Sequence, residues 1–324
     1  MINILEYTNY KIFWDELGLD SSKECLYLLY HQRRYNIEEL SQTSWWKKSK
    51  KIYLIDQEVK SKIINDSVMK DPRIYFWDSS IIDHPRFHTY LWWFDHTKEV
   101  NHRLNLVDLL TPIETKKCEK FFDCLLGTMR EHKWFVYNKI SNHHKKDLFY
   151  QGSINPHCET QTVPGDWKSG GCHENGQSFV NFYGKQFSNV ACFIPYGIYN
   201  QTWYSLVCET RSNGLQFYTE KTAKPIMSRR LFVMFGPKSC LNGLKSLGYK
   251  TFDGIVDESY DNIDDDVTRW SAAWDQIEYL LTQDPSEIYQ KAMPILEHNY
   301  DIFLKTDWHS NMVKEIKKIS SYDF

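Results

Sequence analysis

The chain has 324 residues, of which 42% are hydrophobic, so it can bury the core of one large or two ordinary domains. Its formal net charge of −3 excludes the strong overall basic excess that marks many nucleic-acid-binding proteins. No apolar run approaches the roughly 20 residues that span a bilayer. The start, MINILEYTNYKIFWDE, lacks the basic leader and apolar run of a signal peptide, and the eight cysteines form no CxxC pair. We therefore expect a cytoplasmic protein with reduced thiols and no membrane partner.

The charge is distributed unevenly along the chain. Residues 111–250 carry 18 Lys and Arg against 10 Asp and Glu, a net charge of +8, whereas residues 251–324 carry 6 against 16, a net charge of −10. A basic middle segment suits a polyanionic ligand, such as a nucleotide diphosphate or a nucleic acid. The alternative is charge pairing between the middle and the C-terminal segments.

The first 110 residues alternate short apolar runs with polar segments. Runs that are β-branched and aromatic predict buried strands at 24–30, 51–55, 73–77 and 90–94. Helix-compatible segments lie between them at 36–40 and 59–69. This βαβ rhythm predicts a parallel sheet with helices on its faces. We assign residues 1–110 to an N-terminal, acceptor-side Rossmann-like domain, with a linker at 105–117.

A second βα rhythm follows the linker. Strands are predicted at 120–126, 204–208 and 231–235, and helices at 132–140, 241–247, 265–283 and 285–320, with a further helix that starts at the TEK sequence, residues 219–221. Residues 152–189 are rich in glycine and predict a long surface loop. We assign residues 111–324 to a C-terminal domain that binds a donor nucleotide and ends in closing helices. Ligands of open α/β sheets bind at the carboxyl ends of the strands, which for two such domains predicts a site in the cleft between them.

The segment KFFDCLLGTMREHK predicts a strand, a tight turn at Gly127 and a basic helix start. Arg130, His132 and Lys133 then lie near free helix amides, where the helix dipole favours a phosphate. Basic residues at a helix start are also often simply solvated, and that alternative stays open here.

The segment around TEK predicts a second helix start with the same chemistry. Thr219 can cap the helix, while Glu220 and Lys221 lie in its first turn and Glu209 follows the preceding strand. Lys221 places a cation at the helix end that prefers anions, which makes structural sense if a phosphate binds there. A carboxylate for sugar hydroxyls beside an ammonium for phosphate is what a nucleotide-sugar site needs. The alternative is an ordinary charged helix start.

Three segments carry a resemblance to a known family. TEKTAKPIMSRRLFVMFG, LGYKTFDGIVDESYD and FFDCLLGTMREHK resemble motifs of a family of glycosyltransferases common in tailed phages. Their Glu…TEK pattern is in turn similar to the α-1,3-fucosyltransferase family. The resemblance covers roughly residues 118–300 and departs from the phage pattern at Lys133, where an arginine is usual. It implies the GT-B fold, in which two Rossmann-like domains face each other across a cleft.

The resemblance also implies an activity, that of a hexosyl- or pentosyltransferase with a UDP-type nucleotide-sugar donor. It implies that Glu220 holds ribose hydroxyls and that Lys221 and Arg130 neutralise the diphosphate. Glu209 would contact the donor sugar, while Thr219 and Lys133 would complete the donor site. A general base for the acceptor hydroxyl should come from the N-terminal domain. Our first choices are Asp95 and His96, with Asp83 and His84 as alternatives.

Two patterns bear on metal ions. The run Asp264–Asp266 superficially matches the D-x-D of metal-dependent transferases, but we interpret it as the acidic start of a helix. Two pairs, His157-Cys158 and Cys172-His173, could ligate zinc, although adjacent ligands strain its tetrahedral geometry. The resemblance to the fucosyltransferase family implies that cations and amides stabilise the leaving diphosphate, so we expect no metal and no cofactor.

The acceptor is the least defined part of the prediction. The phage context favours 5-hydroxymethylcytosine in double-stranded phage DNA, modified with arabinose or glucose. The cluster Lys47, Lys48, Lys50 and Lys51 would then contact DNA phosphates while the modified base is flipped out. Alternatives are a glycan or lipopolysaccharide acceptor, or a non-catalytic module that binds DNA or glycans.

Overall fold

The chain forms two compact units in a computed structural model. The structure describes Leu17 and residues 24–29, 41–56, 70–126, 130–151, 179–182, 185–188 and 190–321. Unit 1 comprises Met1–Asp95 and Asp307–Phe324, and unit 2 comprises His96–Thr306. By compactness the division therefore falls at Asp95 rather than at residue 110, and the C-terminal segment returns to unit 1. The cleft between two facing domains stays a prediction.

Unit 1 is built on a four-stranded parallel sheet with the order β1-β2-β3-β4. Its strands are β1 (Glu24–Leu29), β2 (Lys51–Asp56), β3 (Ile74–Asp78) and β4 (Phe87–Thr89). The strands predicted from residues 24, 51 and 73 are confirmed, and β4 was not foreseen. The short helix α3 (Ser44–Lys48) precedes β2. The helices expected at 36–40 and 59–69 lie outside the described residues.

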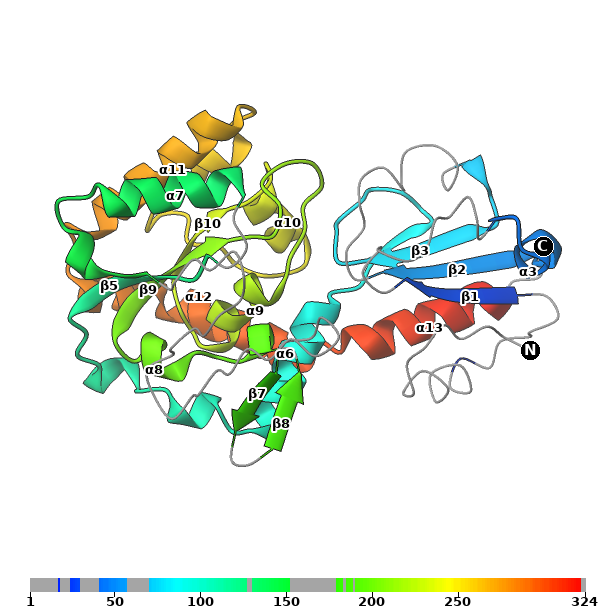
Figure 1. Cartoon of the computed structure of the whole chain (residues 1–324), viewed down its shortest axis with the longest axis horizontal. Coiled ribbons are helices and arrows are strands. Elements are labelled where there is room, and N and C mark those ends of the chain that lie inside the picture. The colour runs from blue at the N-terminus through cyan, green and yellow to red at the C-terminus, as the bar shows by residue number, and fades with distance from the viewer. Residues whose placement is uncertain are drawn as a thin grey trace. The chain divides into compact units, whose positions relative to one another are not determined.

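Helix α13 (Trp308–Ser321) covers one face of this sheet (Figure 1). Tyr53 of β2 and Trp77 of β3 are fully buried in one apolar cluster with Val313 and Ile316 of α13. Both strands are buried on their other face too, as Ile52 shows, which explains why they lack the alternation of half-exposed strands. The C-terminal segment is therefore part of the core of unit 1.

Both ends of α13 are held by side chains of unit 1. Near its start, the backbone N–H of His309 donates to Oδ2 of Asp95 over 2.8 Å. At its end, Nζ of Lys51 donates to the carbonyl oxygens of Ile319 and Ser320, over 2.6 and 3.1 Å. An anion at the helix N-terminus and a cation at its C-terminus both complement the helix dipole.

Two predictions about secondary structure are wrong. The run predicted as a strand at 90–94 instead enters α6 (Trp92–Arg103), which buries Phe94, Thr97 and Asn101 at helical spacing. The helix predicted at 285–320 is two helices, α12 (Pro285–Lys305) and α13, because Thr306 takes an extended conformation.

Unit 2 contains a second four-stranded parallel sheet with the order β10-β9-β5-β6. Its strands are β5 (Lys120–Cys124), β6 (Phe149–Gln151), β9 (Thr202–Cys208) and β10 (Phe232–Phe235). The three strands predicted here are confirmed, while β6 was missed. An antiparallel pair, β7 (Phe179–Phe182) and β8 (Lys185–Ser188), lies within the segment predicted as a loop.

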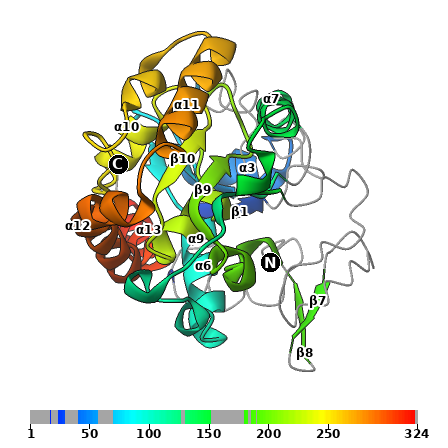
Figure 2. The ribbon, with the colours of Figure 1, turned by 90° about the vertical axis from the view of Figure 1, so that its left-hand side faces the viewer.

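Helices cover both faces of the sheet in unit 2. Figures 1 and 2 show α7 and α11 on one face and α9 and α12 on the other. The helices after α6 are α7 (Glu131–Ser141), α8 (Tyr196–Tyr199), α9 (Glu220–Met227), α10 (Cys240–Ser246), α11 (Asp266–Leu280) and α12. Two short 3-10 turns, Val107–Leu109 and Ile113–Thr115, occupy the predicted linker. No helix of the described residues is both long and apolar enough to cross a membrane.

A buried ion pair joins the central strands of unit 2. Nη2 of Arg230, a residue only 2% exposed, lies 2.8 Å from Oδ1 of Asp123 on β5. The same guanidinium donates to Oγ of Ser205 on β9 and to the carbonyl oxygens of Tyr199 and Thr202. A buried charge pair is tolerated when hydrogen bonds satisfy both partners, as they do here. Arg230 is therefore a structural arginine of the sheet.

We expect the substitution Ile316→Ala to destabilise unit 1, because it opens a cavity between α13 and the sheet. Loss of a fully buried Ile side chain costs about 2–4 kcal/mol. The exposed neighbour Lys317, changed to alanine, should alter the free energy of unfolding by less than about 0.5 kcal/mol. Hydrogen exchange of the backbone amides of residues 51–56 measures the free energy of unfolding of both variants. Unchanged protection of β2 in the Ile316 variant would contradict the packing of α13 on this sheet.

Candidate functional site

The sheet of unit 2 reverses its winding between β5 and β9. From β5 the chain passes through α7 to β6 on one side, and from β9 it passes through α9 to β10 on the other. Adjacent strands whose connections lead away in opposite directions leave a crevice at their carboxyl ends, the usual ligand site of open α/β sheets. Both helix starts singled out in the sequence, that of α7 and that of α9, follow these two strands.

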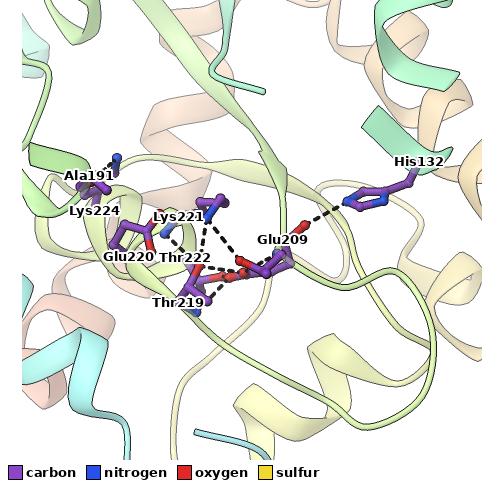
Figure 3. Close-up of polar contacts among 9 residues, drawn as sticks. His132, Ala191, Glu209, Thr219, Glu220, Lys221, Thr222 and Lys224 are labelled. Atoms are coloured by element: carbon purple, nitrogen blue, oxygen red, sulfur yellow. Dashed lines mark hydrogen bonds and ion pairs between the residues drawn. The ribbon is translucent and has the colours of Figure 1, made fainter. Parts of the chain in front are cut away.

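Glu209 closes the loop between β9 and α9. Its side chain is fully buried, and Oε2 accepts hydrogen bonds from the N–H of Thr210 (3.1 Å) and from Oγ1 of Thr219 (2.7 Å). Oε1 accepts from the N–H of Thr219 (3.1 Å) and from Oγ1 of Thr222. Four protein donors thus use both oxygens (Figure 3). We assign Glu209 a positioning role, in place of the sugar contact that the resemblance implied.

Thr219 is the N-cap of α9, as its sequence position predicted. Its backbone is extended, with φ −126° and ψ −170°, and Oγ1 accepts a hydrogen bond from the N–H of Lys221 over 3.3 Å. Because the hydroxyl also donates to Glu209, the cap and the buried carboxylate form one unit. Farther along the same loop, Nη2 of Arg269 on α11 donates to the carbonyl of Ser212 over 2.9 Å. The start of α9 is therefore held from two sides.

The first turns of α9 hold a compact group of charges. Nζ of Lys221 lies 2.7 Å from Oε1 of Glu220 and 3.2 Å from Oγ1 of Thr210. Burial opposes ionisation of Glu220, but the ammonium groups of Lys221 and Lys224 outweigh it and hold the pKa of Glu220 below its ordinary value. Nζ of Lys224 donates to the carbonyl of Ala191 over 2.7 Å (Figure 3). Glu220 is thus an ionised carboxylate at the helix start.

The start of α7 is joined to the same loop by His132. This histidine is fully buried, and its Nε2 lies 2.8 Å from the carbonyl oxygen of Glu209. Since a carbonyl only accepts, Nε2 carries the proton and donates it. Burial, aided by the nearby cations of Lys133 and Arg130, lowers the pKa of His132 to about 4, so the ring is neutral at pH 7. The first turns of α7 and α9 are therefore fixed to each other through Glu209.

Two further cations stand at the start of α7. Arg130 is the exposed N-cap residue, with an extended backbone. Lys133 is only 2% exposed, and in the described part of the chain no hydrogen bond or ion pair reaches its ammonium. Burial and repulsion from Lys221 lower the pKa of Lys133 to about 8, against the attraction of Glu209 and Glu220. A buried cation without a counterion is a feature that ligand sites, more than structural sites, display.

The structure thus brings five of the residues predicted for a donor site, and Arg130 at the α7 N-cap, to the carboxyl ends of β5 and β9 in unit 2. Two helix N-termini, the ammonium groups of Lys133 and Lys221, and the carboxylate of Glu220 meet beside the ends of β5 and β9. Free helix amides and cations bind phosphate oxygens, and a carboxylate accepts hydrogen bonds from hydroxyl groups. Sequence reasoning missed Lys224, although its spacing of four residues from Glu220 on a predicted helix was the available signal.

The residues predicted for the acceptor side have different surroundings. Asp95 binds the start of α13 through Oδ2, so we assign it a helix-capping role. Burial, against attraction by Glu99, lowers the pKa of His96, whose part in catalysis stays a prediction. In the turn before β4, Nδ1 of His84 accepts from the N–H of Arg86, and Asp83 is exposed.

The four lysines predicted to contact DNA separate into two groups. Lys47, Lys48 and Lys50 are exposed on and after α3. Lys51 is buried at the start of β2 and binds the last carbonyl groups of α13, so it cannot share their surface. The prediction that Lys51 contacts DNA is corrected on that ground: its ammonium binds the end of α13.

The acidic motifs near the C-terminus have structural partners. Asp265 caps α11 by accepting from the N–H of Thr268 over 2.9 Å, and Asp264 pairs with Lys238. In the DESYD segment, both oxygens of Asp261 accept from the N–H of Leu241 at the start of α10. Among the described residues, no three His, Cys, Asp or Glu side chains are grouped as metal ligands. The two His/Cys pairs considered for zinc lie outside those residues.

Comparison with known proteins finds two solved structures that align with this one. No protein-family model matches the chain, and no curated protein matches it by sequence. A crystal structure of an α1,3-fucosyltransferase aligns over 96% of this chain and 94% of its own, with a TM-score of 0.41 and 9% identity. A mutant of T4 phage BGT in complex with UDP-glucose aligns over 96% of this chain and 78% of its own, with a TM-score of 0.35 and 11% identity.

We expect the substitution Glu209→Gln to loosen the site. An amide NH₂ in place of one carboxylate oxygen faces N–H and O–H donors, so hydrogen bonds to Thr210 and Thr219 are lost. Leaving buried polar groups unsatisfied costs about 1–3 kcal/mol. Chemical denaturation measures this loss, with the exposed Glu131→Gln on α7 as the matched control. Equal stability of the two variants would contradict the role given to Glu209.

Proposed function

We propose that this protein is a glycosyltransferase that moves a sugar from a nucleotide-sugar donor to a hydroxyl group. The observation that supports it most is the pairing of two helix N-termini at the switch between β5 and β9, with cations for a diphosphate and one carboxylate for hydroxyls. The resemblance of the TEK and DESYD segments to phage glycosyltransferases supports the same activity.

In the proposed donor site, Lys133 and Lys221 bind the diphosphate together with amides at the uncapped start of α7, and exposed Arg130 adds a third cation. Oε1 of Glu220 is engaged by Lys221, while no other residue of the described chain donates to Oε2. Glu220 therefore has an oxygen for a ribose or sugar hydroxyl. Glu209, Thr219 and His132 hold these groups in place without contacting the ligand.

The reaction proposed for this site is a group transfer. The bond between the anomeric carbon and the β-phosphate oxygen breaks as the acceptor oxygen bonds to that carbon, and the hydroxyl proton passes to a base or to water. The negative charge that develops on the leaving diphosphate lies where the cations and helix dipoles of this site stabilise it. The nucleotide is proposed to be UDP, following the resemblance.

For the acceptor we propose 5-hydroxymethylcytosine in double-stranded DNA, modified with arabinose or glucose. The phage-type motifs support it, together with the exposed Lys47, Lys48 and Lys50, which can contact phosphates without reading sequence. A glycan acceptor is the competing proposal, and it is favoured by the small net charge of the chain.

Removal of the ammonium in Lys221→Met is expected to weaken binding of UDP about tenfold or more, since hydrogen bonds between charged groups contribute about 1.5–3 kcal/mol each. Isothermal titration calorimetry measures the change. Lys250→Met, at an exposed position of unit 2, serves as the control and should bind like the parent protein. Equal affinity of the Lys221 variant would remove α9 from the donor site.

The acceptor is tested by incubating the protein with hydroxymethylated and unmodified duplex DNA and a panel of nucleotide sugars, followed by mass analysis of the nucleosides. A mass gain confined to hydroxymethylcytidine is expected. We also expect an effect of changing Lys47, Lys48 and Lys50 together to alanine. The slope of log DNA affinity against log salt concentration should decrease by the equivalent of up to about three phosphate contacts. The exposed pair Lys145 and Lys146, changed in the same way, is the control. The absence of a mass gain with every donor would refute a DNA acceptor.

A further inference from the structure

Lys133 is a buried lysine at the start of α7. Its side chain is 2% exposed, and none of the hydrogen bonds or ion pairs within the described residues involves its ammonium. Arg230 pairs with Asp123 and Lys224 donates to a carbonyl, whereas buried Lys116, before β5, has no hydrogen bond or ion pair among the described residues either. Burial of the Lys133 side chain reduces the hydration of its ammonium, which favours the neutral amine.

The charged and titratable groups around Lys133 come from four elements. They are Arg130 and His132 on α7, Cys124 on β5, Cys208 and Glu209 after β9, and Glu220 and Lys221 on α9. The two carboxylates attract the ammonium, but four donors occupy Glu209, and Lys221 already pairs with Glu220. The ammonium of Lys221 repels that of Lys133. Burial together with this repulsion lowers the pKa of Lys133 to about 8.

We propose that Lys133 couples proton uptake to ligand binding: a diphosphate that enters the site favours the ammonium of Lys133 over its neutral amine. This inference rests on the proposed donor site. A diphosphate beside Lys133 and Lys221 supplies the counter-charge that the empty site lacks, which favours the charged form of Lys133. The proton comes from the solvent, and no covalent bond to the ligand forms.

The direction of the effect follows from linkage. A group that is more basic in the complex than in the free protein binds a proton on complex formation, so affinity falls as pH rises above the free-state value. Between pH 8 and pH 9.5, the affinity should fall roughly fifteenfold, with the slope approaching tenfold per pH unit. An arginine at this position would keep its charge throughout, so the lysine gives the site its pH sensitivity.

The test is calorimetric titration of the whole chain with UDP, GDP and ADP at pH 8.5 in buffers of different ionisation enthalpy. The terminal phosphate of these ligands is ionised well above its second pKa of about 6. The ligand that binds tightest is then titrated between pH 7.5 and 9.5. We expect uptake of about 0.8 proton per ligand at pH 8.5 and the fall in affinity given above.

Three variants identify the proton acceptor. Lys133→Arg should bind without proton uptake and with affinity that changes less than about twofold over this range, since its guanidinium stays charged. Lys133→Met should bind the nucleoside diphosphate weakly and without proton uptake. Lys139→Arg, an exposed change two turns along the same helix, should reproduce the behaviour of the parent protein.

The outcomes separate this inference from the function on which it rests. If a nucleoside diphosphate binds with no proton uptake, or if uptake persists in Lys133→Arg, the donor site stands and the role of Lys133 is refuted. If none of the three ligands binds the parent protein, the proposed function fails and the inference fails with it.

Discussion

The buried carboxylate of Glu209 is the interaction on which the rest of the site depends. Its side chain binds Thr210, Thr219 and Thr222, which closes the loop after β9 and caps α9. Its backbone carbonyl accepts the hydrogen bond from His132, which fixes the start of α7. A single residue at the end of β9 thereby sets the spacing of two helix N-termini, and with it the position of every cation that we assign to the ligand. A charged group can serve this purpose in the core because its hydrogen bonds are complete.

The two buried charge systems of unit 2 differ in a way that separates fold from function. Arg230 and Asp123 neutralise each other, and the surrounding hydroxyl and carbonyl groups satisfy the guanidinium, so this pair stabilises the sheet without needing a ligand. Lys133 has no such partner among the described residues, and its burial costs free energy. A buried lysine alone does not locate a ligand, since Lys116, before β5, is buried without an ion pair among the described residues too. We place the ligand at the starts of α7 and α9 because Lys133 lies there with Lys221, Glu220 and the uncapped start of α7.

Much of this arrangement was predictable from residues that act locally. Thr219 could be identified as a cap from its position before Glu220, and short apolar runs such as that at β2 indicated buried strands. Contacts between distant residues were not predictable in this way. The hydrogen bond from Lys51 to the end of α13, and the four donors around Glu209, depend on which elements the fold brings together. The aromatic run that enters α6 was misassigned because a short apolar run has no period of its own, and only the buried positions that follow it, up to Asn101, show the helix.

The central claim is that a diphosphate binds between the first turns of α7 and α9. A crystal structure of the protein with a bound nucleoside diphosphate tests it most directly. We expect phosphate oxygens within hydrogen-bonding distance of Nζ of both Lys133 and Lys221, with a ligand hydroxyl on Glu220 and the carboxylate of Glu209 still bound to its threonines. Phosphates located elsewhere in unit 2, away from the carboxyl ends of β5 and β9, would contradict it.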